Sequence, residues 1–287
     1  MSTVLYQRDG RIARVTLNRP EVLNAIDGAM PQDLASAIET ANADPGVHVI
    51  VLSGAGRAFC AGYDLTYYAE TTTGEGHEVT QEMPWDPVKD FAFMKRNTDL
   101  FMSVFRSLKP VVCKVHGFAV AGGSDIALCA DMVIMAEDAQ IGYMPARVWG
   151  CPTTAMWVYR LGPERAKRML LTGDKVDGRE AERMGLVLKA VPASNLDDEI
   201  ERLAERMASV PVNQLVMQKM MVNQALENMG LASTQTLATF FDGVTRHSPE
   251  GLNFKARAEE VGWKQAARER DSGTYDWTAN RPINAPR

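Results

Sequence analysis

The first half of the chain alternates short apolar strands with turns of small residues, and this alternation restricts the possible folds more than any other feature. Val47–Leu52 and Val111–Val115 are continuous apolar runs, each followed by a turn rich in glycine and alanine, and Asp131–Ala136 is a further run of this kind. Continuous apolar runs of this length are typical of strands that are buried on both faces. Amphipathic segments at Pro31–Asn42 and Phe91–Leu108 predict helices between the strands. The pattern therefore predicts an α/β fold, in which helices pack on a sheet.

The two ends of the chain depart from this alternation. Near the N-terminus, Asp9-Gly10 joins two β-prone segments, Val4–Gln7 and Arg11–Leu17, and predicts a hairpin. The segment after Asp271 is polar and contains two prolines, so we expect it to be extended. From Pro163 onward, glycine and proline signals separate segments that predict helices: Glu164–Thr172, Gly178–Met184, Leu196–Ser209, Gln214–Asn228 and Leu231–Arg246.

Composition excludes several classes of protein. The chain has 287 residues, of which 46% are hydrophobic, and its net charge of −5 is spread along the chain without a basic run. We therefore expect no nucleic-acid partner. No apolar stretch approaches the roughly 20 residues of a membrane helix, and the N-terminus carries no signal-peptide pattern. The cysteines and histidines are too scattered for a metal site, so we expect a cytoplasmic protein without bound metal or a membrane partner.

The turn after the strand at Val47–Leu52 contains small residues in an unusual arrangement. It reads Ser53-Gly54-Ala55-Gly56-Arg57-Ala58-Phe59-Cys60-Ala61-Gly62-Tyr63-Asp64-Leu65. Gly54 and Gly56 begin a dinucleotide-binding pattern, but Phe59 occupies the position that requires the third glycine. A nicotinamide cofactor is therefore not expected.

The turn after the strand at Val111–Val115 has a different chemistry. Gly122 and Gly123 open a predicted helix from Gly122 to Ala130, so free N–H groups and the positive end of the helix dipole point at one place. Such a place suits an oxygen atom that becomes negatively charged, and Asp125 supplies a carboxylate in the same helical turn. Two interpretations remain open here. Either this is a reactive site, or the glycines only allow close packing and Asp125 is an ordinary acidic residue of a helix N-terminus.

Taken together, these segments resemble the crotonase (enoyl-CoA hydratase) superfamily in order and spacing. The resemblance extends from about Val4 to Arg257, and its most diagnostic parts are the AGxDL and AGG elements. The matching segments are Asn18-Arg19-Pro20, Asn24-Ala25-Ile26, Phe59–Leu65, Gly117–Gly123, Leu170-Leu171-Thr172-Gly173, Ala181 and Gly185-Leu186-Val187.

The resemblance implies a crotonase-like spiral of ββα turns followed by a C-terminal helical region. On this basis we expect a core with the CoA-ester and oxyanion site over residues 1–200, a helical oligomerisation region over 201–270 and an extended tail over 271–287. It also implies a homotrimer or homohexamer that acts on an acyl-CoA in fatty acid metabolism. Coenzyme A would enter as part of the substrate, with no separate cofactor.

The resemblance also implies specific site residues. The backbone N–H groups of Tyr63 and Gly122 would form an oxyanion hole for an enolate oxygen, and such donors are typically worth about 100- to 1000-fold in rate. Asp125 would be the catalytic acid/base. Arg57 and Arg19 are candidates for the phosphates of CoA. The residues expected to bind the substrate are Ala61, Gly62, Asp64, Leu65, Gly123, Arg57 and Tyr143.

The chain departs from the family at its two acid/base positions. Hydratases of the family use two glutamates; Asp125 stands at the first of these positions and Ala146 at the second, and Gly150–Thr154 lacks the usual glycine run. Tyr143, Thr153 or a water molecule are candidates to replace the second glutamate. The leading hypothesis is an enoyl-CoA hydratase-like lyase that adds water reversibly to a 2-enoyl-CoA and relies on Asp125. An enoyl-CoA isomerase, an acyl-CoA decarboxylase and a non-catalytic CoA-ester-binding protein remain alternatives.

Methionine and tryptophan residues are numerous in the middle of the chain. They either line an acyl pocket or fill the core, and adaptable methionine side chains suit both roles. The residues in question are Met83, Trp85, Met94, Met144, Trp149, Met156 and Trp157.

Overall fold

A computed structural model describes residues 2–70 and 83–283, and it has the α/β architecture that the sequence predicts. The larger sheet has six strands in the order β1-β2-β3-β4-β6-β9. The pair β1–β2 is antiparallel, which confirms the hairpin at Asp9-Gly10, and the other neighbours are parallel. The strands are β1 (Val4–Asp9), β2 (Ile12–Leu17), β3 (Val49–Gly54), β4 (Val111–Val115), β6 (Met132–Ala136) and β9 (Lys189–Val191).

A smaller sheet of three strands stands beside the larger one. In it β5 pairs with β7 in parallel, and β7 pairs with β8 in antiparallel orientation. An isolated bridge between Cys60 and Ala119 connects the turn after β3 to β5. The smaller sheet therefore holds the two small-residue turns next to each other. Its strands are β5 (Phe118–Val120), β7 (Gln140–Gly142) and β8 (Lys175–Asp177).

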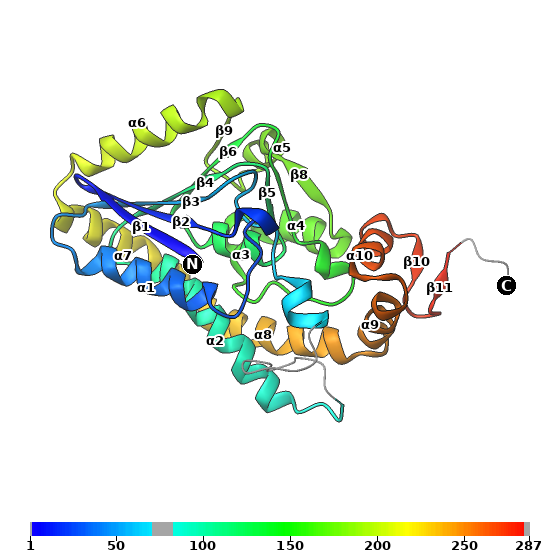
Figure 1. The fold of residues 1–287 in the computed structure, drawn as a ribbon. Coiled ribbons are helices and arrows are strands. Elements are labelled where there is room, and N and C mark those ends of the chain that lie inside the picture. The colour runs from blue at the N-terminus through cyan, green and yellow to red at the C-terminus, as the bar shows by residue number, and fades with distance from the viewer. Residues whose placement is uncertain (1, 71–82, 284–287) are drawn as a thin grey trace.

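Helices cover both faces of the larger sheet. Figure 1 shows α6 (Leu196–Ala208) above the sheet and α1 (Met30–Ala43) and α2 (Pro87–Arg106) below it. The short helix α3 (Gly122–Leu128) begins directly after β5 and is buried along its whole length. Each of these helices overlaps a segment that the sequence predicts as helical.

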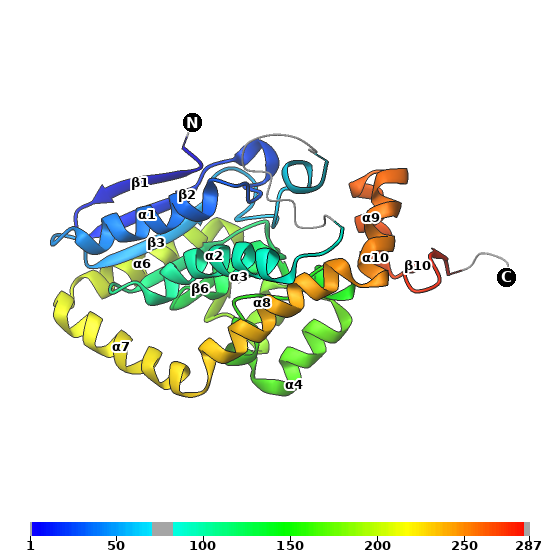
Figure 2. The ribbon, with the colours of Figure 1, turned by 90° about the horizontal axis from the view of Figure 1, so that it is seen from below.

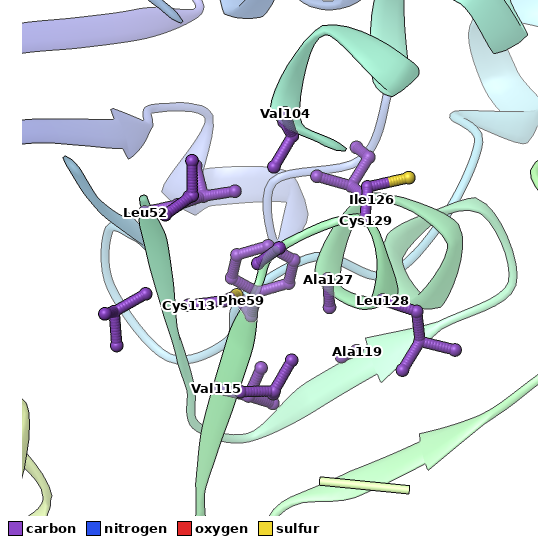
Figure 3. Packing of buried hydrophobic residues seen from close by; sticks show 14 of the residues in the cluster. Leu52, Phe59, Val104, Cys113, Val115, Ala119, Ile126, Ala127, Leu128 and Cys129 are labelled. Carbon is purple, nitrogen blue, oxygen red and sulfur yellow. The ribbon is translucent and has the colours of Figure 1, made fainter. Parts of the chain in front are cut away.

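The core between sheet and helices fixes the position of the first turn. Phe59 is fully buried between Leu52, Cys113 and Val115 of the sheet and Ile126 of α3 (Figure 3). Burial of a side chain of this size contributes about 1.5–3 kcal/mol relative to its exposure. Because Phe59 precedes Ala61-Gly62 by two residues, this burial holds that turn against the core.

The second half of the chain is mainly helical, as the sequence predicts. Helix α8 runs alongside α2, and α9 and α10 form a projecting unit at one end of the molecule (Figure 2). Helix α4 starts earlier than predicted because Met156, Trp157 and Leu161 pack into the core before the Gly162-Pro163 step. The helices are α4 (Met156–Thr172), α5 (Gly178–Arg183), α7 (Val212–Asn228), α8 (Leu231–His247), α9 (Pro249–Val261) and α10 (Trp263–Ser272).

The segment after Asp271 is more ordered than a simple tail. It forms a small antiparallel pair of strands, β10 (Tyr275–Asp276) and β11 (Arg281–Pro282). Tyr275 and Trp277 are buried in an aromatic cluster with α9 and α10. The expectation of an extended tail is based on the polar character of this segment. Burial of the two aromatic rings instead fixes the segment against the helices.

Short single-turn helices join several of these elements. The most important here is η3, which follows β7 and leads to the segment Gly150–Thr154. These helices are η1 (Pro20–Val22), η2 (Thr66–Glu70), η3 (Met144–Arg147) and η4 (Ala193–Asn195). Within residues 2–70 and 83–283, no helix combines the length and the apolar character that a membrane span requires.

Candidate active site

The two small-residue turns meet through backbone contacts. Cys60 donates its N–H to the carbonyl of Phe118 at 2.8 Å, and Val120 donates to the carbonyl of Cys60 at 3.1 Å. The turns lie so close that a side chain at Gly122 would come within 3.0 Å of the Tyr63 ring. A side chain at Gly123 would overlap the Cys60 carbonyl. Close packing is thus one reason for these glycines, and it brings the backbone of Tyr63 beside that of Gly122.

The amides of Tyr63 and Gly122 have no backbone acceptor in the described part of the chain. Both residues belong to the wall of the same cavity. Ala121, which precedes Gly122, has φ 50° and ψ −127°, a conformation that is costly for a residue with a side chain. Gly62 precedes Tyr63 and has φ +91°. Unusual backbone angles thus come immediately before both free amides, and the pair can bind one oxygen atom as an oxyanion hole does.

The cavity beside these amides has a volume of about 140 Å³ and a mostly apolar wall. Five residues that the family resemblance implies belong to this wall: Ala61, Tyr63, Leu65, Gly122 and Tyr143. Met94, Met144 and Trp149 also belong to it, whereas Met156 and Trp157 are core residues. The remaining wall residues are Tyr68, Phe93, Ala121, Pro145, Asp242, Arg246 and Arg270.

Asp125 lies one helical turn behind Gly122 and is not part of the cavity wall. Its carboxyl group is buried, and the Thr154 hydroxyl donates a hydrogen bond to it at 2.6 Å. Burial raises the pKa of Asp125 to about 8, although the Thr154 hydrogen bond opposes the shift and the nearby Asp242 adds to it. A carboxyl group in this state holds a proton at neutral pH, as a general acid must.

Other residues implied by the resemblance shape the turn without reaching the cavity. Asp64 forms an ion pair with Arg19 at 3.0 Å and accepts a hydrogen bond from the amide of Thr66. Arg19 also forms an ion pair with Asp27 at 3.2 Å, so carboxylates of the neighbouring loops neutralise its charge. Arg57 is exposed on the first turn. Of the two arginines considered for the CoA phosphates, Arg57 is therefore the one whose side chain is open to solvent.

The second acid/base position is held by a residue that cannot transfer a proton. Ala146 lies in η3, is half-buried and does not reach the cavity wall. Tyr143 donates its hydroxyl hydrogen to the Cys151 carbonyl at 3.0 Å, and burial raises its pKa well above the ordinary range. Thr153 is buried outside the wall. Neither the tyrosine nor the threonine supplies a second carboxylate.

Charged residues from the C-terminal helices complete the wall, and the sequence analysis missed them. Arg246 of α8 is buried between Asp242, at 3.1 Å, and Asp90 of α2, at 2.7 Å. Arg270 of α10 is also buried. A signal existed in α8, where Gln235, Thr239, Asp242 and Arg246 recur at helical spacing and are buried. Within the described residues, no three His, Cys, Asp or Glu side chains gather as metal ligands would.

Comparison with known proteins gives the family of the chain. The family model described as enoyl-CoA hydratase/isomerase matches residues 7–265. The chain belongs to the enoyl-CoA hydratase/isomerase family. A protein named putative enoyl-CoA hydratase from Thermus thermophilus is 34% identical over 241 residues, which cover 83% of this chain and 90% of that protein. The crotonase resemblance and the fold class predicted from the sequence are thereby confirmed.

Solved structures of the family superimpose closely on this chain. A crystal structure of an enoyl-CoA hydratase from Mycobacterium smegmatis has a TM-score of 0.89 and 46% sequence identity, and the match covers 99% of this chain and 97% of that one. A structure of an enoyl-CoA hydratase/isomerase from Xanthobacter autotrophicus has a TM-score of 0.84 and 29% identity, with 95% and 98% of the two chains covered. The similarity thus includes the C-terminal helices that complete the cavity.

Proposed function

We propose that this chain is an acyl-CoA-processing lyase of the enoyl-CoA hydratase type, which adds water reversibly to a 2-enoyl-CoA. One observation carries the proposal: the unpartnered amides of Tyr63 and Gly122 stand together at an apolar cavity. A 2-enoyl thioester presents one carbonyl oxygen that becomes negatively charged as the β-carbon is attacked. We propose that the two amides bind that oxygen, and family membership supports this chemistry.

The proposed reaction needs a proton as well as an oxyanion hole. When the oxygen of water bonds to the β-carbon, the double bond becomes an enolate, and the α-carbon must then be protonated. Asp125 holds a proton at neutral pH because burial raises its pKa to about 8, and we propose it as the acid/base group. The acyl group would lie among Phe93, Met94 and Trp149. Coenzyme A enters with the substrate, and we propose no resident cofactor.

The direct test is turnover of crotonyl-CoA, followed by the loss of enoyl absorbance, together with thermal shift in the presence of CoA esters. Asp125→Asn keeps the side-chain volume but cannot transfer a proton, so turnover should fall about 100-fold or more. Asp138→Asn makes the same change at an exposed position and should leave turnover unchanged.

Other outcomes would favour the alternative functions. A thermal shift without turnover of any ester would favour a CoA-ester-binding protein. Migration of a double bond, or release of CO2 from a carboxyacyl-CoA, without hydration would favour an isomerase or a decarboxylase. Undiminished turnover in Asp125→Asn would leave the oxyanion hole in place and remove the acid/base role of Asp125.

We propose further that the protein is a cytoplasmic homotrimer or homohexamer. Apolar side chains are exposed along α7 and α8, including Met217, Met221, Leu237, Phe240 and Phe241. Large apolar side chains that are exposed along two helices favour a protein–protein contact. The four cysteines are free thiols, as expected in a reducing compartment.

A further inference from the structure

Hydration requires two proton transfers, and the family's two carboxylate positions do not supply both at this cavity. One proton leaves the attacking water and another reaches the α-carbon. Ala146 cannot transfer a proton, and Asp125 already holds a proton at neutral pH, so it suits the second transfer and not the first. A group that faces the substrate and takes the proton from water is therefore missing from the family pattern.

Asp242 is the one carboxylate in the wall of this cavity among the described residues. It comes from α8, which has an unusual distribution of side chains. The buried face of α8 is polar, with Gln235, Thr239 and Asp242, whereas Leu237 and Phe240 on another face are exposed. A helix that buries its polar residues must satisfy them inside the protein, because an unpaired buried polar group is costly. Here Gln235 and Asp242 bind the loop next to the cavity and Asp242 also lines the cavity, whereas the Thr239 hydroxyl has no hydrogen-bond partner among the described residues.

That loop, residues 151–154, connects Asp242 with Asp125. The amide of Cys151 donates to Asp242 Oδ1 at 3.0 Å. At the other end of the loop, the Thr154 hydroxyl donates to Asp125 at 2.6 Å, and its carbonyl accepts a hydrogen bond from Gln235 Nε2 at 2.9 Å. One short segment thus fixes both carboxyl groups, and α8 holds that segment at two points.

We propose that Asp242 is the second acid/base carboxylate of this site, in the place of the glutamate that Ala146 replaces. The inference rests on the proposed hydratase function. In the step that follows, the oxygen of water bonds to the β-carbon while its O–H bond breaks and the proton passes to Asp242. Asp125 gives its proton to the α-carbon, and the proton on Asp242 returns to Asp125 through solvent before the next turnover.

The surroundings of Asp242 suit a base. Burial raises the pKa of Asp242 above its ordinary value, and the Arg246 guanidinium, 3.1 Å from Oδ2, opposes this rise. Asp90 shares the same guanidinium from α2. Asp125 contrasts with both, because a hydroxyl is its partner and no cation of residues 2–70 or 83–283 forms an ion pair with it. Two carboxyl groups with environments that differ in this way are suited to opposite roles.

The matched pair of variants Asp242→Asn and Asp90→Asn tests the proposal. Both side chains are buried to the same extent and both pair with Arg246, but only Asp242 belongs to the cavity wall. We expect kcat for crotonyl-CoA hydration to fall about 100-fold or more in Asp242→Asn and less than 10-fold in Asp90→Asn, with thermal shift by CoA esters retained in both. Equal losses in the two variants would overturn the proposal, because they would show that the shared ion pair is all that matters.

A second variant covers the case in which Asp242→Asn does not fold. Asp242→Glu keeps the carboxylate and its charge beside Arg246, so this variant should fold. If Asp242→Asn also folds, Asp242→Glu should retain at least ten times its turnover. If Asp242→Asn does not fold, Asp242→Glu should still show measurable hydration. A folded Asp242→Glu without turnover would overturn the proposal. Unchanged protein that binds CoA esters but hydrates none would instead overturn the proposed function, and the inference with it.

Discussion

Asp125 and Asp242 show how the partners of a buried carboxyl group determine its chemistry. Both are buried, but Asp125 contacts the Thr154 hydroxyl and Asp242 contacts the Arg246 guanidinium. Burial raises the pKa of both carboxyl groups, and at Asp242 the adjacent cation opposes the rise more strongly than a hydroxyl can. The sequence could identify Asp125, because it follows Gly122-Gly123 within one helical turn. It could not identify Asp242, which is brought to the cavity only when α8 packs against α2.

The raised pKa of Asp125 has a consequence for stability. Its pKa rises from the ordinary value of 3.8 to about 8 on folding, so the folded chain binds an additional proton between these values. The contribution of this group is fully present below about pH 4 and is lost as the pH rises through about 8. Asp125→Asn removes this dependence, and its melting temperature should exceed that of the unchanged protein increasingly from pH 5 to pH 8. Parallel melting curves for the two proteins across this range would contradict the shift.

Gly122 gives a separate test of the oxyanion hole. In Gly122→Ala the added methyl group would lie 2.9 Å from Ile26 Cδ1 and 3.0 Å from the Tyr63 ring, so the Ile26 side chain or Tyr63 must shift. Displacement of either amide should lower kcat by about 100-fold, because the enolate loses one of its two donors. Binding of a saturated acyl-CoA should weaken much less, since its oxygen carries little charge. Equal losses in kcat and in acyl-CoA affinity would show that the substitution damages the pocket as a whole.

At the scale of elements, the sequence predicts the strands and helices of the alternating first half. It does not predict which face of α8 is buried. Strand β4 has the bounds predicted from its apolar run, and α1, α2 and α3 differ from prediction only at their ends. Apolar periodicity predicts these elements because their apolar faces are the buried ones. In α8 the relation is reversed, since Phe240 and Phe241 are exposed and Asp242 is buried. A rule that places apolar residues inside cannot find a polar buried face.

Trp149 joins the cavity to the α9–α10 unit. Its ring lies 5.4 Å from that of Phe254 in α9 and 5.0 Å from that of Trp263 in α10, measured between centroids. Trp149→Ala removes this contact and one side of the cavity wall. We expect a loss of about 3–5 kcal/mol in the free energy of unfolding and a raised KM for enoyl-CoA. Trp149→Phe keeps an aromatic ring, so its free energy of unfolding should fall less. If urea unfolding gives the same loss of free energy for both variants, aromatic packing of Trp149 does not stabilise the α9–α10 unit.

At the scale of the whole molecule, the cavity belongs to both halves of the chain. The N-terminal part provides Tyr63 and Gly122, and the C-terminal helices provide Asp242, Arg246 and Arg270. A division into a core at residues 1–200 and a helical region at 201–270 describes the order of elements along the chain. It does not reveal that the helical region supplies the charged part of the cavity, because that depends on the packing of α8 and α10, and the polar periodicity of α8 does not say which cavity its buried face lines.

The two faces of α8 connect the proposed assembly to the proposed chemistry. Leu237 and Phe240 on one face are exposed apolar residues that suit the proposed assembly, while Asp242 on the buried face lines the cavity. If a second copy of the chain covers the apolar face, light scattering at micromolar concentration should give the mass of a trimer or hexamer. Leu237→Glu should then lower that mass, because burial of an unpaired charge in the contact is costly. It should also reduce hydration, since α8 loses the support that keeps Asp242 in place.

Val88→Glu is the control for this prediction. It introduces the same charge at an exposed apolar residue of α2 and should change neither the mass nor the hydration rate. A monomeric mass for the unchanged protein would contradict the assembly and leave the roles of Tyr63 and Gly122 untouched.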